Sequence, residues 1–309
     1  MIFLQQLING LTYGSLLGFI ALGYTMVYGV LKLINFAHGD VVTLAAFLSI
    51  TFIPIMGILG SVGTVVIILL VMASICIVAA VLERFAYRPL RSAPRLSLIV
   101  SALGAGMVIQ NAIMLIWGAN PRVFPSELIP QKLYKFQWAA EAGAEVQLAS
   151  EFTITSLSIF TLLLNIIVMT FLIFFIHKTR SGIAIKALSI DYTTAQLMGV
   201  NINRTITLVF VIGGAIGALG GILIGANYNT VPFNMGFEYG IKAFIAAILG
   251  GIGSIPGAMF GGILLGLVYT FSAGYLSTVW ADSFAYGLLI ILLIFRPNGI
   301  FGEITVHKV

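Results

Sequence analysis

Charged side chains are scarce along this chain of 309 residues and make up only 8% of it, whereas a soluble domain carries about 25%. Hydrophobic residues make up 60%, and the mean hydropathy is +1.11. A water-soluble fold of this length cannot bury so much apolar surface. The apolar runs are about twenty residues long, which suits transmembrane helices rather than the strands of about ten residues in a membrane barrel. The composition therefore predicts an all-α, polytopic integral membrane protein.

Cysteine and recognisable catalytic motifs are also scarce. Cys76 is the single cysteine, so no internal disulfide forms, and it lies in an apolar run. The histidines His38, His177 and His307 lie far apart, without a second His or Cys at metal-ligand spacing. No phosphate-cradling G-x-x-x-x-G-K-[ST] loop is present, and the glycine-rich stretch 213–221 lies within an apolar run, as in closely packed membrane helices. We therefore expect no catalytic residue, no cofactor and no metal.

Carboxylates are absent from the middle of every apolar run. Asp40, Glu238 and Asp282 fall at the edges of runs. This pattern argues against a proton-driven carrier, because such carriers usually need a protonatable group within the membrane. It does not exclude sodium coupling through backbone carbonyls, and it favours a permease powered from elsewhere or a passive channel. Lys242 follows Glu238 by four residues, so we expect the two to neutralise each other at a helix end.

Apolar segments divide the chain into a single transmembrane domain, residues 1–309. Segment 239–250 is short for a bilayer, and the first segment runs on into a polar stretch, so we predict eight to ten transmembrane helices. The first segment lacks a basic start and is too long for a removable signal peptide, so it is expected to remain as the first helix. The segments are 4–30, 41–59, 62–82, 96–118, 153–176, 205–227, 239–250, 255–275 and 279–295.

The distribution of basic residues predicts the orientation. Basic residues gather in loops 83–95 and 177–204, which the positive-inside rule assigns to the cytoplasm. The loop at about 119–152 lies between them, with one helix leading to it and one returning, and is therefore expected outside. Arg296 and Lys308 place the C-terminus inside. The N-terminus is then outside if every segment spans fully.

The polar stretch LINFAHGD, Leu33–Asp40, interrupts the first apolar region. It is either an ordinary turn near the cytoplasmic surface or a helix break placed beside a transport path. A weak echo at Leu249–Gly266 also puts glycine and a helix-breaking residue ahead of a helix, and paired interruptions of this kind are typical of internal repeats with broken helices. We expect Asn35 and Gly39 to shape the break, and His38 and Asp40 to face protein or water. The predicted path residues are Asn35, His38, Gly39, Asp40, Gly251 and Gly253.

The cytoplasmic loop 177–204 contains signals for two short helices. Ser181 can cap the first, and Asp191 can cap the second over Tyr192–Met198, with Gly199 just past its end. So short a helix is unstable alone in water and needs a surface to pack on. That surface is either its own membrane domain and the lipid, or a separate protein. The predicted coupling residues are Ser181, Lys186, Asp191, Ala195, Leu197, Met198 and Gly199, of which Ala195, Leu197 and Met198 offer apolar contact area.

Four stretches together resemble the permease subunits of bacterial ABC importers for branched-chain and other hydrophobic amino acids, in particular the first of their two homologous permeases. They are QQLINGLTYGSLLGFIALGYTMVYGVLKLINFAHGD, SGIAIKALSIDYTTAQLMGVN, GGIGSIPGAMFGGILLG and RPNGIFG. The resemblance covers essentially the whole chain in order. Many such importers carry a Glu-Ala-Ala pattern ahead of a glycine in the coupling loop. Here DYTTAQLMG keeps the alanine and the glycine but begins with Asp191.

The resemblance implies a multi-pass subunit of the bacterial inner membrane with no enzymatic activity of its own. It implies a second homologous permease, two cytoplasmic ATP-binding subunits and a periplasmic substrate-binding protein as partners, and no nucleic acid. ATP hydrolysis in those partners would move the coupling loop and open the path alternately to each side. Two alternatives stay open: an ABC permease for urea or short amides, and a self-contained secondary carrier or channel.

Overall fold

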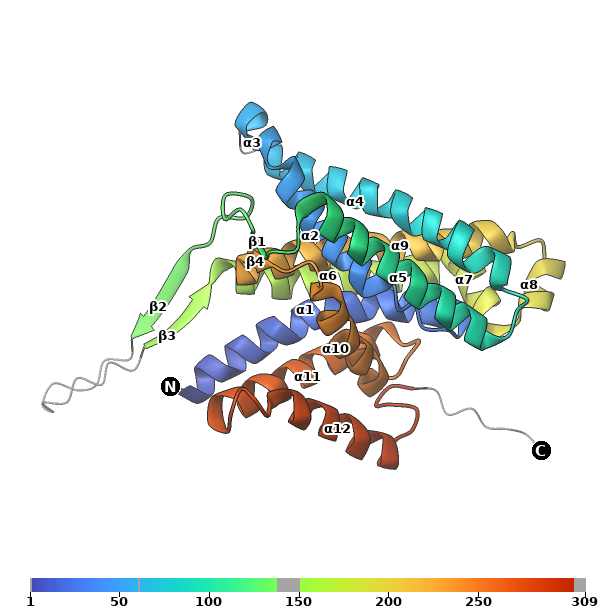
Figure 1. Cartoon of the computed structure of the whole chain (residues 1–309). Coiled ribbons are helices and arrows are strands. Elements are labelled where there is room, and N and C mark those ends of the chain that lie inside the picture. The colour runs from blue at the N-terminus through green and yellow to red at the C-terminus, as the bar shows by residue number, and fades with distance from the viewer. Residues whose placement is uncertain (1, 61, 138–150, 303–309) are drawn as a thin grey trace, which may run out of the picture.

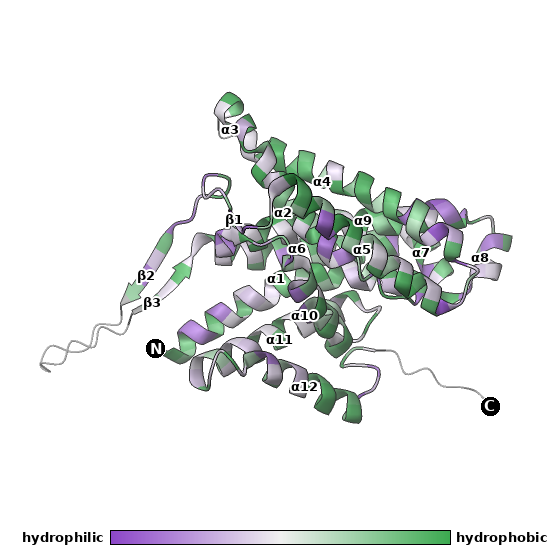
Figure 2. Cartoon of the chain, in the orientation of Figure 1, coloured by the Kyte–Doolittle hydropathy of each residue, from purple (hydrophilic) through white to green (hydrophobic). Residues whose placement is uncertain are grey.

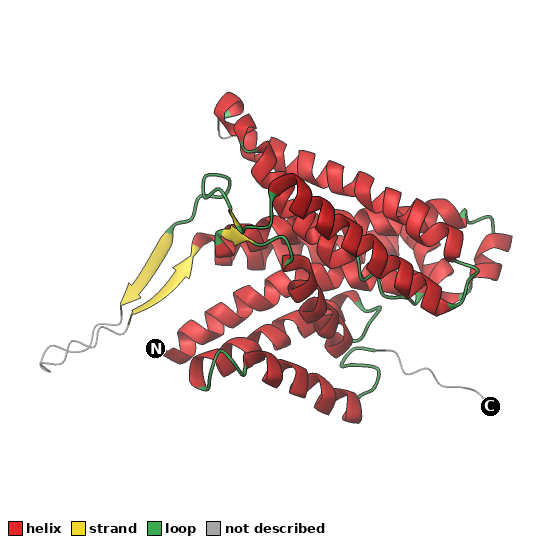
Figure 3. Ribbon diagram, viewed as in Figure 1, coloured by secondary structure: helices red, strands yellow, loops and turns green. Residues whose placement is uncertain are grey.

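The computed structural model describes residues 2–60, 62–137 and 151–302 and is an assembly of helices with two small strand pairs (Figures 1 and 3). A π-helical turn at Glu83–Tyr87 and a 3-10 turn at Arg88–Leu90 follow α4. The helices are α1 (Ile2–Leu31), α2 (His38–Phe52), α3 (Pro54–Leu59), α4 (Val62–Leu82), α5 (Arg95–Trp117), α6 (Ser156–Lys178), α7 (Arg180–Ile190), α8 (Tyr192–Leu197), α9 (Ile202–Tyr228), α10 (Met235–Gly250), α11 (Ile255–Tyr275) and α12 (Ala281–Phe295).

Six of the described helices are long and apolar enough to cross a membrane, namely α1, α4, α5, α6, α9 and α11. The helices α2 and α12 are apolar but shorter, at 15 residues each. Helices α1 and α9 are mostly buried, whereas α4, α5 and α6 leave most of their residues incompletely buried and form the hydrophobic exterior (Figure 2). The chain is therefore an all-α, polytopic membrane protein, as predicted. The prediction of eight to ten spans includes α2, α10 and α12, which are shorter than a bilayer requires.

Two antiparallel strand pairs lie at the opposite end of the molecule from α7 and α8 (Figure 1). Strand β1 (Arg122–Val123) pairs with β4 (Thr230–Val231), and β2 (Leu133–Gln137) pairs with β3 (Glu151–Thr155). They lie within the loop predicted to be external and beside the end of α9. Within that loop Glu141 and Glu145 fall outside the described residues, as do Lys308 and the rest of the tail, 303–309.

Close glycine contacts hold α1 against α11. The two helices run antiparallel, with Gly10 against Thr270, Gly14 against Ile263, and Gly18 beside Met259. A Cβ added at Gly14 would come within 2.6 Å of the backbone Cα of Ile263. Glycines four residues apart allow the two backbones to approach, as in other membrane helix pairs. This packing fixes the central helix α1, whose C-terminal end carries the functional features below.

Candidate functional site

The polar stretch after α1 is a helix break buried inside the bundle. Helix α1 ends at Leu31, Lys32 adopts a left-handed backbone conformation (φ 54°), and α2 begins at His38. The His38 ring lies against Gly23 of α1 and Gly217 of α9. Gly23 is a little more than two turns, or about 12 Å, before the end of α1. Helix α2 thus begins within the bundle and not at its surface.

Two buried polar side chains anchor the break. The Tyr87 hydroxyl donates a hydrogen bond of 2.7 Å to Asn35 Oδ1, joining the break to the turn after α4. His38 is 2% exposed, and its ring packs edge-on against Tyr24 with 4.9 Å between centroids. Both residues face protein. Their enclosure is what a break inside a membrane protein requires, because exposed polar groups are costly in lipid.

The other predicted path residues lie in two separate places. Gly39 packs against Gly236 of α10, and Asp40 is half-buried in the first turn of α2 beside Gly106 of α5. Gly251 and Gly253 instead form the turn between α10 and α11.

The two breaks also differ in how the following helix starts. Ser254 caps α11 by accepting a hydrogen bond from the Gly257 amide at 3.2 Å, whereas α2 has no side-chain cap. The internal repeat therefore stays a prediction, since the described breaks share their placement ahead of a helix but not their capping.

Helix α7 begins two residues earlier than a cap at Ser181 allows. Thr179, not Ser181, caps it: Thr179 has an extended backbone, and its Oγ1 accepts a hydrogen bond of 3.0 Å from the Gly182 amide. Ser181 already lies in the first helical turn, where its backbone is helical and cannot take the capping position. The prediction for Ser181 was therefore wrong. Gly182 packs on the backbone of Phe175 and Ile176, which ties α7 to the end of α6.

The predicted cap of α8 is confirmed. Asp191 Oδ1 accepts hydrogen bonds from the amides of Thr193 (2.7 Å) and Thr194 (3.3 Å), and Oδ2 accepts one from the Thr194 hydroxyl (2.8 Å). The Thr194 hydroxyl and these amides hold the pKa of the Asp191 carboxyl below its ordinary value. Asp191 is therefore ionised at neutral pH, the charge state that a helix N-terminus stabilises.

Helix α8 presents two apolar side chains to the outside. Leu197 and Met198 are 82% and 81% exposed, and Gly199 (φ 84°) ends the helix in the left-handed conformation expected of a residue just past it. Ala195 is 3% exposed and packs against its own chain, so its predicted role as outward contact area was wrong. Its place on the inner face follows from helical spacing relative to Leu197.

A single hydrogen bond connects α8 to the helix break. The Tyr192 hydroxyl donates to the backbone carbonyl of Val30, in the last turn of α1, at 3.2 Å. Carbonyls in the last turn of a helix have no partner within it, so Tyr192 satisfies one of them. Helix α8 and the end of α1, where the break begins, are therefore in direct contact, which the sequence did not reveal.

A second buried network lies beside this junction. The Glu83 carboxylate is fully buried and pairs with Arg88 (2.8 Å) and Arg91. The Thr207 hydroxyl donates to the same carboxylate at 2.8 Å, which ties the loop after α4 to α9. Sequence spacing placed Glu83 only at a helix end. A buried carboxylate without such partners would be strongly destabilising.

The predicted pair Glu238–Lys242 is confirmed and has a third member. Lys242 Nζ lies 2.8 Å from Glu238 and 3.0 Å from Asp282 of α12, and 4.8 Å above the ring of Tyr269. The lysine side chain is 3% exposed, whereas the glutamate and aspartate side chains are 64% and 46% exposed. The cluster joins α10, α11 and α12 and carries a net charge of −1. Both carboxylates pair with the lysine, as ionisable groups in membrane proteins commonly pair with one another.

Within the described residues, no group of three or more His, Cys, Asp or Glu side chains could hold a metal. His38 and Asp40 both lie in the first turn of α2, whereas Cys76 lies in α4 with its Sγ near the Val211 carbonyl of α9. The absence of metal, cofactor and catalytic residues stays a prediction. The arrangement instead connects the capped helix α8 to the buried helix break after α1 through one hydrogen bond.

Comparison with known proteins assigns this architecture to a family. The family model for the branched-chain amino acid transport system / permease component matches residues 6–294. The chain is 40% identical to the high-affinity branched-chain amino acid transport system permease protein BraD of Pseudomonas aeruginosa, over 99% of the chain and 98% of BraD. It is 39% identical to LivH of Escherichia coli K12 over the same shares.

More distant relatives follow the same pattern. A probable branched-chain amino acid transport permease protein LivH of Methanocaldococcus jannaschii is 26% identical over 95% of the chain and 91% of that protein. No solved structure matches. The family match covers nearly every described helix, from α1 to α12, and the two bacterial relatives align end to end. The chain therefore belongs to the family of permease components of branched-chain amino acid transport systems.

Proposed function

We propose that this chain is the transmembrane permease subunit of an ATP-driven importer that moves branched-chain and similar hydrophobic amino acids across a bacterial inner membrane. The observation that carries the proposal is the near-full-length similarity to permeases named for high-affinity branched-chain amino acid transport. Its partners are a second homologous permease, two cytoplasmic ATP-binding subunits and a periplasmic substrate-binding protein. The C-terminus is cytoplasmic.

The mechanism rests on α8 as the contact with an ATP-binding subunit. Leu197 and Met198 are exposed at the end of a short helix whose start is capped by Asp191. This exposure suits an apolar groove on a partner better than a face packed on its own chain. A displacement of α8 reaches the end of α1 through Tyr192 and Val30. Since α2 begins where the break ends, this displacement alters the angle between α1 and α2. Rocking of broken helices in this way gives alternating access.

The path itself runs beside the break in this proposal. Asn35, His38 and Asp40 supply polar groups near the N-terminus of α2, whose positive end favours a carboxylate. Gly39 lets α10 approach closely. The substrate-binding protein supplies most of the specificity, so the path need not bind its amino acid tightly.

Co-purification tests the role of α8. The double variant Asp191→Lys/Gly199→Val removes the cap and places a β-branched residue at φ 84°, where no neighbour lies within 4 Å of the new Cβ. We expect this variant to insert normally, to retain much less ATP-binding subunit on purification, and to lose transport. The matched control is Lys135→Gln/Gly104→Ala, which changes charge and glycine content away from α8. Normal retention of the ATP-binding subunit by the first variant would contradict the proposal.

A further inference from the structure

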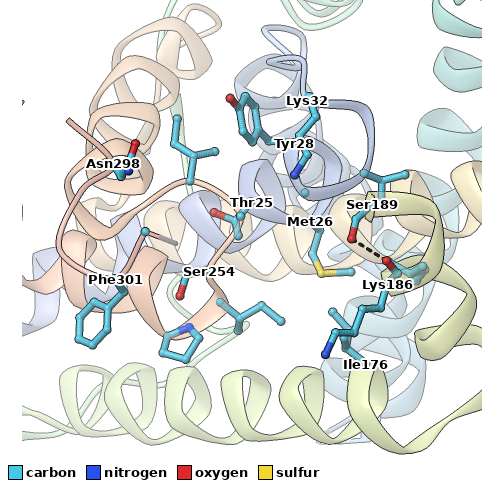
Figure 4. Close-up of a pocket in the computed structure, with 18 of the residues that line it drawn as sticks. Thr25, Met26, Tyr28, Lys32, Ile176, Lys186, Ser189, Ser254, Asn298 and Phe301 are labelled. Carbon is cyan, nitrogen blue, oxygen red and sulfur yellow. Dashed lines mark hydrogen bonds between the residues drawn. The ribbon is translucent and has the colours of Figure 1, made fainter. Parts of the chain in front are cut away.

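A cavity of about 610 Å³ lies where the coupling segment α7 meets the transmembrane helices (Figure 4). Its walls come from the last turns of α1 and α6, from α7, from the turn between α10 and α11, and from the segment after α12. The helix ends that surround it lie at the same end of the molecule as α8 (Figure 1). In the proposed orientation this is the cytoplasmic side, at the depth of the lipid head groups.

The charge lining this cavity has one sign. Lys32, His177 and Lys186 lie along its wall, and no described aspartate or glutamate does. Figure 4 shows the ammonium groups of Lys32 and Lys186 above and below Met26. No ion pair among the described residues involves either lysine. Two ammonium groups with no carboxylate beside them attract an anion.

The start of a long helix adds to this attraction. The wall includes Ser254, the N-cap of the 21-residue helix α11, so the positive end of a long helix faces the same space. Helix N-termini combined with lysine side chains are a common arrangement for phosphate binding. The structure thus provides a second observation for an anion, independent of the lysines.

Part of the wall is apolar and borders the outside of the bundle. Ile176 of α6, Ile185 of α7 and Ile248 of α10 line it. Helix α6 exposes large apolar side chains such as Phe171 and Phe174, each 60% exposed, and so faces lipid. A ligand with a phosphate and hydrocarbon chains matches this division, because its head lies near the lysines and its chains pass along α6.

We propose that this cavity binds the phosphate of an anionic phospholipid from the cytoplasmic leaflet. Basic pockets between transmembrane helices on this side of a membrane bind such head groups. The bound phosphate bridges Lys32, just after α1, and Lys186 of α7. The lipid therefore holds the coupling segment against the helix that ends at the break. The proposal depends on the orientation above but not on which substrate is carried.

Lipid binding to the purified full-length chain tests this proposal. Native mass spectrometry measures how much phosphatidylglycerol the protein retains relative to phosphatidylcholine. We expect Lys32→Gln and Lys186→Gln each to weaken retention of phosphatidylglycerol about fivefold, and the double variant to lose the preference. The control Lys135→Gln, on β2 at the opposite end, removes the same charge and should bind as the unaltered protein does. Lys186→Arg keeps the charge and, unlike Lys186→Gln, should bind phosphatidylglycerol as the unaltered protein does.

Two results would overturn the proposal. One is a double variant that folds, shows an unchanged melting temperature in phosphatidylcholine, and still prefers phosphatidylglycerol as strongly as the unaltered chain does. The other result concerns inorganic phosphate alone at millimolar concentration. It would raise the melting temperature of the unaltered chain as much as phosphatidylglycerol does, and would not raise that of the double variant. The second result assigns the cavity to free phosphate, so the source of the ligand is decided by the same experiment.

Discussion

Tyr192 joins two features that lie 162 residues apart in the chain. Its hydroxyl reaches the Val30 carbonyl in the last turn of α1, while its backbone opens the capped helix α8. On the other side of the break, Asn35 is fixed by Tyr87. In the proposed mechanism, a displacement of α8 is passed to a segment whose far end is held. At the scale of single residues, Tyr192 supplies the hydrogen bond that joins α8 to α1 in the described structure.

Substituting Tyr192→Phe removes the donor and keeps the ring. A hydrogen bond of this kind contributes about 1 kcal/mol, so we expect insertion and stability to stay near normal and coupled transport to fall by up to about fivefold. ATP-driven uptake in proteoliposomes measures the change. Tyr134→Phe on β2, where the tyrosine is also partly exposed, is the control and should have no effect. Equal uptake by Tyr192→Phe and the unaltered protein would show that this contact does not carry the motion.

Lys242 holds two carboxylates together across α10 and α12. The variant Lys242→Met leaves Glu238 and Asp282 close to each other with no cation between them. We expect it to lower the free energy of unfolding by about 2–3 kcal/mol, less than for a wholly enclosed charge because both carboxylates are partly exposed. Thermal unfolding in detergent measures this loss.

Neutralising those carboxylates should reverse the effect. Adding Glu238→Gln and Asp282→Asn to Lys242→Met removes the repulsion, and we expect stability to recover in large part. If the triple variant is as unstable as the single one, packing of the lysine stem, rather than charge, explains the loss.

Local chemistry was predictable at the residue scale, and distant contacts were not. The Asp191 cap and the pair Glu238–Lys242 involve residues two to four positions apart, where helical geometry alone decides which groups meet. Asp282 joins that pair from another helix, and Tyr192 reaches Val30 from another part of the chain. No spacing rule places those partners. Ser181 failed for a smaller reason, because Thr179 offers the same chemistry two residues earlier.

The helix pair α1 and α11 forms the most extensive contact between described elements. Gly14→Ala places a Cβ within 2.6 Å of the α11 backbone, so the helices must separate. We expect a loss of about 1–3 kcal/mol in unfolding free energy, measured as a lower melting temperature. Gly104→Ala in α5 meets nothing within 4 Å and should be neutral or slightly stabilising, since alanine favours a helix. Equal melting temperatures for the two variants would contradict this packing.

Most element boundaries followed from the apolar runs, because a bilayer imposes long hydrophobic helices that stand out in a sequence. The depth of the break did not follow. Sequence shows that a helix stops near Lys32, but only the packing of His38 against Gly23 and Gly217 shows that the next helix starts inside the bundle. The proposed repeat rests on similar short patterns, and the described breaks at Asn35 and Gly253 differ in how the following helix is capped.

At the scale of the whole molecule, the helices have a clear division of roles. Helices α1 and α9 form the buried centre, while α4, α5 and α6 present apolar side chains outward (Figure 2). The strand pairs lie at one end, and α7, α8 and the lysine-lined cavity lie at the other (Figure 1). In the proposed mechanism, force applied at α8 acts at one end of the central helix α1, whose other end packs on α11.

Uptake of labelled leucine by proteoliposomes tests the central claim most directly. The liposomes contain this chain with its second permease and ATP-binding subunits, and leucine is supplied on its binding protein. We expect uptake only when ATP is available to those subunits, competition by isoleucine and valine but not by urea, and loss of uptake with Asp191→Lys/Gly199→Val. Uptake that continues without ATP while an ion gradient is maintained would contradict the account.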